Sequence, residues 1–193
     1  MAEGQYDQPV HELTAQAIEG VNKRFGEAGL SDISDFMGNI AATESKFGRD
    51  KLGSYSFSPF QIDSVRHQDI IDRAPSDRME IANSYLQEAL GDSTFSLADV
   101  PYSDLVGEKY GHNPYIGATL TRMGLANIKE AVPGSLEGQA DYWKKYWNTF
   151  AENAKGKPEH FIERSERWNP GATMRQGVTN PYADEVFDER PQW

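Results

Sequence analysis

The sequence predicts a mainly α (α+β) fold, in which a helical domain carries a small β-hairpin and an extended C-terminal tail. Apolar residues recur at helical spacing over most of positions 1–168, and a chain of 193 residues is long enough for one domain with its own core. Between positions 49 and 63 polar and aromatic residues alternate, which is typical of a short strand or hairpin. Positions 169–193 are rich in proline, glycine and acidic residues without a period, so we expect an acidic tail there.

The first two helices are predicted from their apolar stripes and their end signals. Apolar residues recur every three or four positions over 9–25, and the glycines of 26–29 end this helix. The second helix begins near Ser31 or Asp32, because either side chain can cap a helix, and it ends at Gly48.

Helical patterns resume after the expected hairpin. Two helices are predicted over 65–73 and 76–90, with a proline between them, and a loop with a short helical turn follows over 91–111. Asn113 followed by proline is typical of a helix start, and the Val-Pro-Gly sequence at 132–134 ends that helix.

The last two predicted helices lie on either side of Gly156. Ser135 begins one whose apolar face carries Trp143 and Trp147, and a short helix covers 158–168. We find no internal repeat and no heptads, so one domain over 1–168 and one tail over 169–193 are expected.

Composition excludes several classes of function. Nineteen basic against thirty acidic residues give a net charge of -11, with no basic stripe, so nucleic acid is not an expected partner. No apolar run reaches the roughly 18 residues of a membrane span, and the N-terminal residues do not form a signal peptide. If the protein acts outside the cytoplasm, we expect something else to carry it there.

Metal and cofactor chemistry are also not expected. The chain has no cysteine, and its four histidines are far apart, without a pair at metal-binding spacing. Glycine-rich phosphate loops and the Gly-x-Ser-x-Gly sequence of serine hydrolases are absent from the sequence.

Glu44 lies on the apolar stripe of the second helix, seven residues after Met37 and three before Phe47. Burial favours the neutral acid and raises the pKa, and a carboxylic acid that is protonated near neutral pH can donate a proton to a glycosidic oxygen. A glutamate near a helix end is more often a boundary residue that reaches solvent or an ion pair. The residue alone leaves both interpretations open.

The segments around Glu44 resemble a known family. "ESKFG" followed by "SPFQID" resembles the Glu-Ser and Gly-Leu-Met-Gln-Ile motifs of lysozyme-like lytic transglycosylases. It is also similar to goose-type lysozyme, where Gln-Val-Asp is followed by a histidine, as in "QIDSVRH" here. Further along, "NPYIG" is similar to the family's Asn-Ile-x-x-Gly and "KYWNT" to its Ala-Tyr-Asn. The resemblance covers about 33–149, and "YWKKYWNTFAENAKGKPEHFIER" also resembles bacteriophage virion-associated peptidoglycan-cleaving domains.

The resemblance implies a role for each matching residue. Glu44 would be the general acid that then acts as base, and Ser45 would be an orienting hydroxyl beside it. Gln61 and Asn148 would contact sugar or N-acetyl groups, and Asn113 would open the next helix of the site. Each of these polar side chains could instead serve its own helix or loop.

Aromatic residues could complete the substrate site. Tyr55 and Phe60 are candidates for stacking on sugar rings, although some of the aromatic residues here must belong to the core. Trp147 stands where the family tyrosine would hold the acid, and an indole N–H can donate a hydrogen bond but cannot accept one. Either that contact is altered, or Tyr146 supplies it from a shifted register. Ser58 and the proline after it also replace the family's Gly-Leu pair.

Asp63 bears on whether the reaction is hydrolysis or transglycosylation. An inverting hydrolase holds a water with a second carboxylate, for which Asp63 and Asp50 are candidates and the goose-type comparison favours Asp63. A lytic transglycosylase uses the substrate's own hydroxyl to close an anhydro ring and needs only the glutamate. Asp63 could equally cap the helix that follows it.

We therefore expect a lysozyme-like domain that cleaves the bond between N-acetylmuramic acid and N-acetylglucosamine in peptidoglycan. Its partners would be glycan strands and, through the acidic tail, other virion proteins, with delivery to the cell envelope by a virion. Two alternatives remain, an inactive lysozyme-like structural or adaptor protein and an unrelated helical interaction module.

Overall fold

The computed structural model describes residues 9–50, 56–148 and 156–169, and this part of the chain is mainly helical. The elements in chain order are α1 (Val10–Glu27), α2 (Ser34–Ser45), α3 (Ser64–Arg73), α4 (Ser76–Leu90), the 3₁₀ turn η1 (Leu97–Asp99), α5 (Tyr102–Val106), α6 (Pro114–Ala126), α7 (Leu136–Tyr146) and α8 (Pro158–Trp168). Among the described residues, no helix has the length and apolar character needed to cross a membrane.

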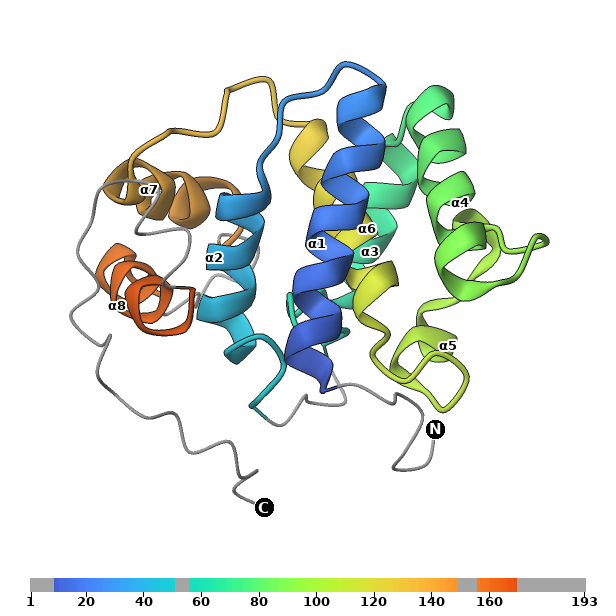
Figure 1. Cartoon of the computed structure of the whole chain (residues 1–193), viewed down its shortest axis with the longest axis horizontal. Coiled ribbons are helices and arrows are strands. Elements are labelled where there is room, and N and C mark those ends of the chain that lie inside the picture. Colours follow the sequence, from blue (N-terminus) through green and yellow to red (C-terminus); the bar gives the residue numbers. More distant parts are fainter. Residues whose placement is uncertain (1–8, 51–55, 149–155, 170–193) are drawn as a thin grey trace.

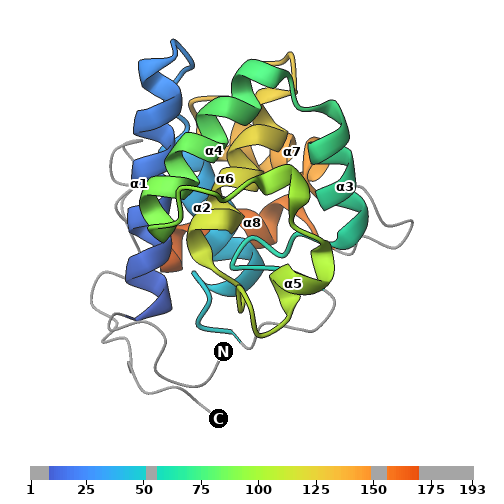
Figure 2. The ribbon, with the colours of Figure 1, turned by 90° about the vertical axis from the view of Figure 1, so that its right-hand side faces the viewer.

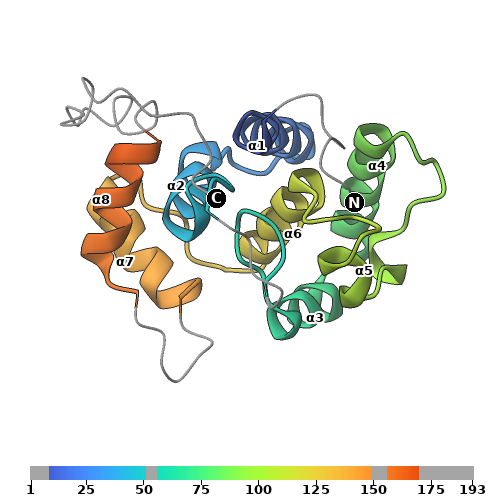
Figure 3. The same cartoon turned by 90° about the horizontal axis from the view of Figure 1, so that it is seen from below.

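Helix α2 lies between two groups of helices. On one side α7 and α8 pack together and α8 packs along α2, while on the other side α1 packs against α6, with α4 beside both (Figure 1). Figure 2 shows α1 and α3 at opposite edges of the second group, with α4 and α6 between them. Seen from below, α7 and α8 lie to one side of α2, and α3, α5 and α4 lie to the other (Figure 3).

Helix α2 is buried on almost every side rather than along one stripe. Of its 12 residues, nine are buried, including polar ones. Because buried polar groups need hydrogen-bond partners, neighbouring helices supply them. The Asn39 amide donates to Gln139 Oε1 of α7 at 2.8 Å, and Asn39 Oδ1 accepts from Asn169 Nδ2 at the end of α8, also at 2.8 Å. Asn169, which the sequence assigned to the tail, thus belongs to the folded domain.

The expected hairpin is not confirmed. Phe57 and Ile62 form an isolated antiparallel bridge through two reciprocal backbone hydrogen bonds of 2.7 and 2.9 Å, and the described residues contain no longer strand. The Phe57, Phe60 and Ile62 side chains are fully buried, so they fix the loop to the core. Part of the predicted hairpin, 51–55, lies outside the described residues, as does 170–193 of the tail.

Three boundaries, in two helices, differ from the sequence prediction. Helix α2 begins at Ser34, because Asp32 Oδ1 accepts hydrogen bonds from both the backbone N and the hydroxyl of Ser34 before the helix starts. It ends at Ser45, since Lys46 and Phe47 take left-handed backbone conformations, with φ of 51° and 59°. Helix α6 ends at Ala126, several residues before the Val-Pro-Gly sequence.

Helix α6 approaches the loop that the Phe57–Ile62 bridge closes, which we call the bridge loop, at Gly117. A Cβ added there would lie 2.2 Å from Ser58 Oγ and 2.4 Å from Ser58 Cβ, so no larger residue fits unless the loop moves. We predict that Gly117→Ala lowers the free energy of unfolding by about 1–3 kcal/mol, as overpacking does. Urea denaturation measures this difference.

Gly26→Ala is the matched control, because a Cβ at this helical glycine meets nothing within 4 Å. It should leave the free energy of unfolding unchanged or raise it by about 0.5–1 kcal/mol, the usual gain for alanine over glycine in a helix. Equal destabilisation by both substitutions would mean that the contact between Gly117 and the loop is unimportant.

Candidate functional site

Glu44 lies in the last turn of α2, on the side that faces α7. Its side chain is partly buried, and Oε1 accepts a hydrogen bond of 3.0 Å from Trp143 Nε1. Desolvation raises the pKa of Glu44 from 4.5 to about 7, although the Trp143 bond and the charges of Arg66 and Arg164 each lower it. Burial outweighs these three effects because water is the better solvent for the charged form. The carboxyl is therefore about half protonated near neutral pH.

Arg66 of α3 connects the surroundings of Glu44 with the end of α7. Its guanidinium lies over the Trp147 ring, with Cζ 4.0 Å from the ring centroid, and Nη2 donates a hydrogen bond to the Trp147 carbonyl. Arg66 is only 8% exposed, and its charge interacts with both Asp63 and Glu44. One buried cation thus lies within electrostatic reach of the two carboxylates that the sequence analysis singled out.

Asp63 is the N-cap of α3. Its Oδ1 accepts a hydrogen bond of 2.7 Å from the backbone N of Arg66, as a capping aspartate does. The capping interpretation is therefore confirmed, whereas a role in holding water remains a prediction. His67, the histidine of the goose-type comparison, is buried beside the Tyr102 ring, and burial lowers its pKa.

Ser45 connects the end of α2 to the bridge loop. Its hydroxyl donates to the Pro59 carbonyl at 2.7 Å and accepts from the backbone N of Gly48 at 2.8 Å. The side chain is fully buried, so it orients the loop and the chain after Glu44, and it has no surface to offer to a substrate. Phe60 is also fully buried, so it is a core residue and not a wall for a sugar ring.

Gln61 takes a left-handed conformation, with φ of 53°, and its side-chain amide donates to the Ser58 carbonyl at 3.4 Å. Ser58 also has a positive φ, of 64°, and its backbone N donates to His112 Nδ1 at 3.2 Å. The loop therefore keeps a tight backbone although serine and proline replace the family's Gly-Leu pair. Gln61 itself is partly exposed and can offer its amide to a ligand.

Tyr146 and Asn148, at the end of α7, have other partners than Glu44. Tyr146 packs on the Tyr142 ring, with centroids 4.7 Å apart, and it lowers the pKa of the Glu130 carboxyl. Tyr146 therefore does not supply the contact to Glu44 that the resemblance would expect from a tyrosine in a shifted register. Asn148 Oδ1 accepts from Lys144 Nζ at 3.2 Å, and Asn148 stays partly exposed.

Asn113 is the N-cap of α6, since its side chain accepts hydrogen bonds from the backbone N of Tyr115 and of Ile116. It is 7% exposed, so helix capping accounts for it without a substrate contact. Tyr55 lies outside the described residues.

Sequence reasoning missed the side chains that surround the Glu44 carboxyl. Trp143 was assigned to the apolar face of its helix, and Arg66 and Arg164 were not singled out. The Arg164 guanidinium donates to the carbonyl of Thr43, the residue before Glu44. The spacing of four residues places Trp143 and Trp147 on one face, as the sequence predicts, but it does not show which of the two rings meets the carboxyl.

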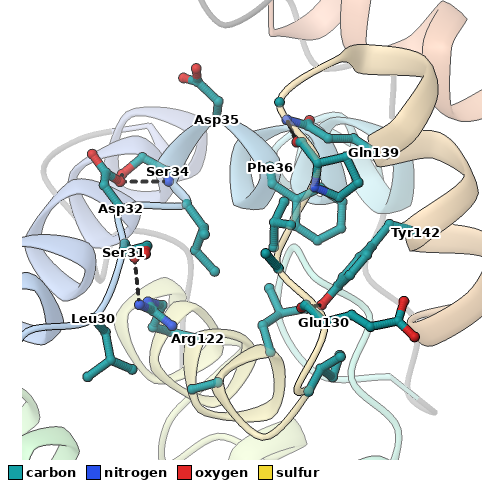
Figure 4. A pocket seen from close by; sticks show the side chains of 18 of the residues that line it. Leu30, Ser31, Asp32, Ser34, Asp35, Phe36, Arg122, Glu130, Gln139 and Tyr142 are labelled. Carbon is teal, nitrogen blue, oxygen red and sulfur yellow. Dashed lines mark hydrogen bonds between the residues drawn. The ribbon is translucent and has the colours of Figure 1, made fainter.

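A cavity lies at the other end of α2. It has a volume of about 740 Å³ and lies between Leu30–Phe36 on one side and Glu130, Gln139 and Tyr142 on the other (Figure 4). Arg122, at its edge, donates to the Ser31 carbonyl at 2.9 Å. Glu44 does not line this cavity.

Within the described ranges, no three histidine, aspartate or glutamate side chains come together as a metal site requires. Comparisons of the chain with protein-family models, with curated proteins and with solved structures found no match. A function therefore has to be inferred from the residues themselves.

The raised pKa of Glu44 makes stability depend on pH. The folded state keeps the Glu44 proton up to about pH 7, whereas the pKa without burial is 4.5. Folding is therefore penalised progressively as pH rises from about 4.5 to about 7. We predict that Glu44→Gln raises the free energy of unfolding by ~3 kcal/mol at about pH 8, because it removes this penalty, and changes it little at about pH 4. Urea denaturation at the two pH values measures the difference.

Glu27→Gln is the control, since Glu27 is an exposed glutamate at the end of α1. It should change the free energy of unfolding equally at both pH values. If Glu44→Gln behaves in the same way as Glu27→Gln, the carboxyl is not desolvated as described.

Proposed function

We propose that this protein cleaves the β-1,4 glycosidic bond between N-acetylmuramic acid and N-acetylglucosamine in peptidoglycan, as a lytic transglycosylase. The observation that carries the proposal is the Glu44 carboxyl, whose burial raises its pKa to about 7 in a residue that is itself partly exposed. A glycosidase acid requires this combination, because it must hold a proton near neutral pH and reach the substrate.

In the first step Glu44 donates its proton to the glycosidic oxygen as the bond to C1 of the muramic acid breaks. The oxygen leaves with N-acetylglucosamine as a hydroxyl, and positive charge develops at C1. The new Glu44 carboxylate is stabilised by the hydrogen bond from Trp143 and by the charges of Arg66 and Arg164. These groups favour the charged form that proton donation creates.

In the second step the carboxylate acts as base. It removes the proton from the C6 hydroxyl of the same muramic acid, and O6 bonds to C1 to close a 1,6-anhydro ring. Glu44 is then protonated again, so one carboxyl serves the whole cycle and no water is consumed. A pKa near 7 suits both halves, because the residue must give up and recover its proton at the same pH.

The position of Asp63 favours the transglycosylase over the hydrolase. Its Oδ1 caps α3, and the neighbouring Arg66 offsets its charge. Both the hydrogen bond and the charge of Asp63 therefore already have a structural partner. An inverting muramidase in which Asp63 holds the water is the second candidate, because Arg66 interacts with both Asp63 and Glu44.

Delivery by a virion completes the proposal. It rests on the resemblance of 142–164 to virion-associated peptidoglycan-cleaving domains. We infer that the acidic segment after Asn169, which lies outside the described residues, contacts another virion protein. Its partner would carry a basic surface, since opposite charges steer association.

The proposed acid is tested by zymography on purified peptidoglycan. Wild type should clear the substrate, and Glu44→Gln should reduce clearing by at least ~100-fold, the usual contribution of a general acid. Glu27→Gln should clear like wild type. Equal clearing by Glu44→Gln and wild type would exclude Glu44 as the acid, and no clearing by either would favour the structural or adaptor role.

The reaction products decide between the two chemistries. Mass spectrometry should find anhydro-muropeptides, and Asp63→Asn should give the same products, because only the substrate's hydroxyl and Glu44 take part. Reducing ends in place of anhydro rings, together with loss of activity in Asp63→Asn, would establish the hydrolase instead. Asparagine caps a helix about as well as aspartate, so Asp63→Asn should keep the α3 cap, and circular dichroism checks that the variant is folded.

A further inference from the structure

Basic side chains gather around one tryptophan beside the end of α2. Lys46 Nζ, Arg49 Cζ and Arg167 Cζ lie 5.6, 5.5 and 5.6 Å from the centroid of the Trp168 ring. These distances are within the range of cation–π attraction, so the ring favours a local concentration of positive charge. We call Lys46, Arg49, Arg164, Arg167 and Trp168 the Trp168 cluster.

The Trp168 cluster borders a cavity of about 220 Å³, which Lys46, Arg164, Arg167, Trp168 and Glu163 line. Arg164 is exposed, and Lys46, Arg167 and Trp168 are partly exposed, so a ligand can reach them from solvent. A space of this size accepts one small charged group on the end of a longer chain.

The charge of this region is opposite to that of the whole protein. Among the described groups, its four cations outnumber the acids beside them, which are Glu163 of the cavity lining, Asp50 at 2.8 Å from Lys46 Nζ, and Glu44, whose charge interacts with that of Arg164. The complete chain carries -11. A positive region on such a protein attracts anions selectively, because the remaining surface repels them.

The Trp168 cluster adjoins the Glu44 carboxyl. Lys46 follows Glu44 by two residues, and Arg164 donates to the carbonyl of Thr43 immediately before it. Helix α8, which carries Arg164, Arg167 and Trp168, packs along α2 (Figure 1). A strand held at Glu44 would therefore have its substituents within reach of these cations.

We propose that the Trp168 cluster binds the carboxylate groups carried by the peptidoglycan strand that Glu44 cleaves. This inference rests on the proposed function, since it assigns the acidic substituents of that substrate to a second contact. The carboxylates come from the stem peptides or, where the stem peptide has been removed, from the freed lactyl group of muramic acid. Guanidinium groups suit both sources, because their paired N–H groups match a carboxylate.

Cosedimentation with purified sacculi tests the proposal, with every protein carrying Glu44→Gln so that the strands stay intact. Lys46→Gln, Arg49→Gln and Arg167→Gln combined should weaken binding about tenfold at low salt, as expected for three partly exposed charge pairs. The difference should disappear at high salt, where such pairs are screened. Arg164 is left unchanged because it contacts the segment that carries Glu44.

The matched control combines Lys23→Gln, Arg73→Gln and Lys129→Gln, three exposed cations outside the Trp168 cluster. Both triple variants lower the net charge by three, so the control should bind like the parent protein. Equal weakening by both would show an effect of net charge alone and overturn the proposal. Unchanged binding of the first triple, or no binding by the parent, would also overturn it.

A charge-retaining triple, Lys46→Arg, Arg49→Lys and Arg167→Lys, should restore binding and so separates loss of charge from misfolding.

Sacculi treated with an amidase identify the source of the carboxylates. The amidase removes the stem peptides and frees a lactyl carboxylate on each muramic acid. Loss of the difference between the triples on these strands assigns binding to stem-peptide carboxylates, and its persistence shows that the Trp168 cluster also binds lactyl carboxylates. Clearing by Glu44→Gln in zymography would refute the proposed acid. The binding results would still show whether the Trp168 cluster binds the strand.

Discussion

The burial of α2 on almost every side is the constraint on which the rest of the structure depends. A helix in that position gives its polar residues little access to water, so the buried ones require protein partners. Asn39 obtains one from α7 and another from the end of α8, Ser45 obtains one from the bridge loop, and Glu44 obtains one from Trp143. The neighbours of α2 are thereby fixed in register, and the same contacts position the carboxyl.

Two tryptophans, Trp143 in α7 and Trp147 directly after it, make the contacts around Glu44 and Arg66. The pattern of the resembling family would place a single tyrosine there. Trp143 donates to Glu44, while Trp147 supports Arg66 through its ring and its carbonyl. An indole N–H stabilises the charged carboxylate and cannot accept a proton from the neutral acid. Trp143 therefore opposes the effect of burial on the pKa of Glu44, and burial is the stronger of the two.

Features that depend on neighbouring residues in the chain could be predicted from the sequence. The bounds of α8 agree with the prediction, and Asp63, Ser135 and Asn113 cap helices through their own next residues. The contact of Trp143 with Glu44 joins residues 99 positions apart, so it depends on how α7 is rotated against α2. The apolar pattern shows which face of α7 is buried but not which buried ring meets a carboxyl.

The hydrogen bond between Asn169 and Asn39 has a mechanical consequence. Asn169 is the last described residue, and its amide is bonded to the middle of the helix that carries Glu44. A pulling force applied at Asn169 would act on this bond and on α8. Tension at Asn169 would thus be transmitted to α2, the helix that carries Glu44.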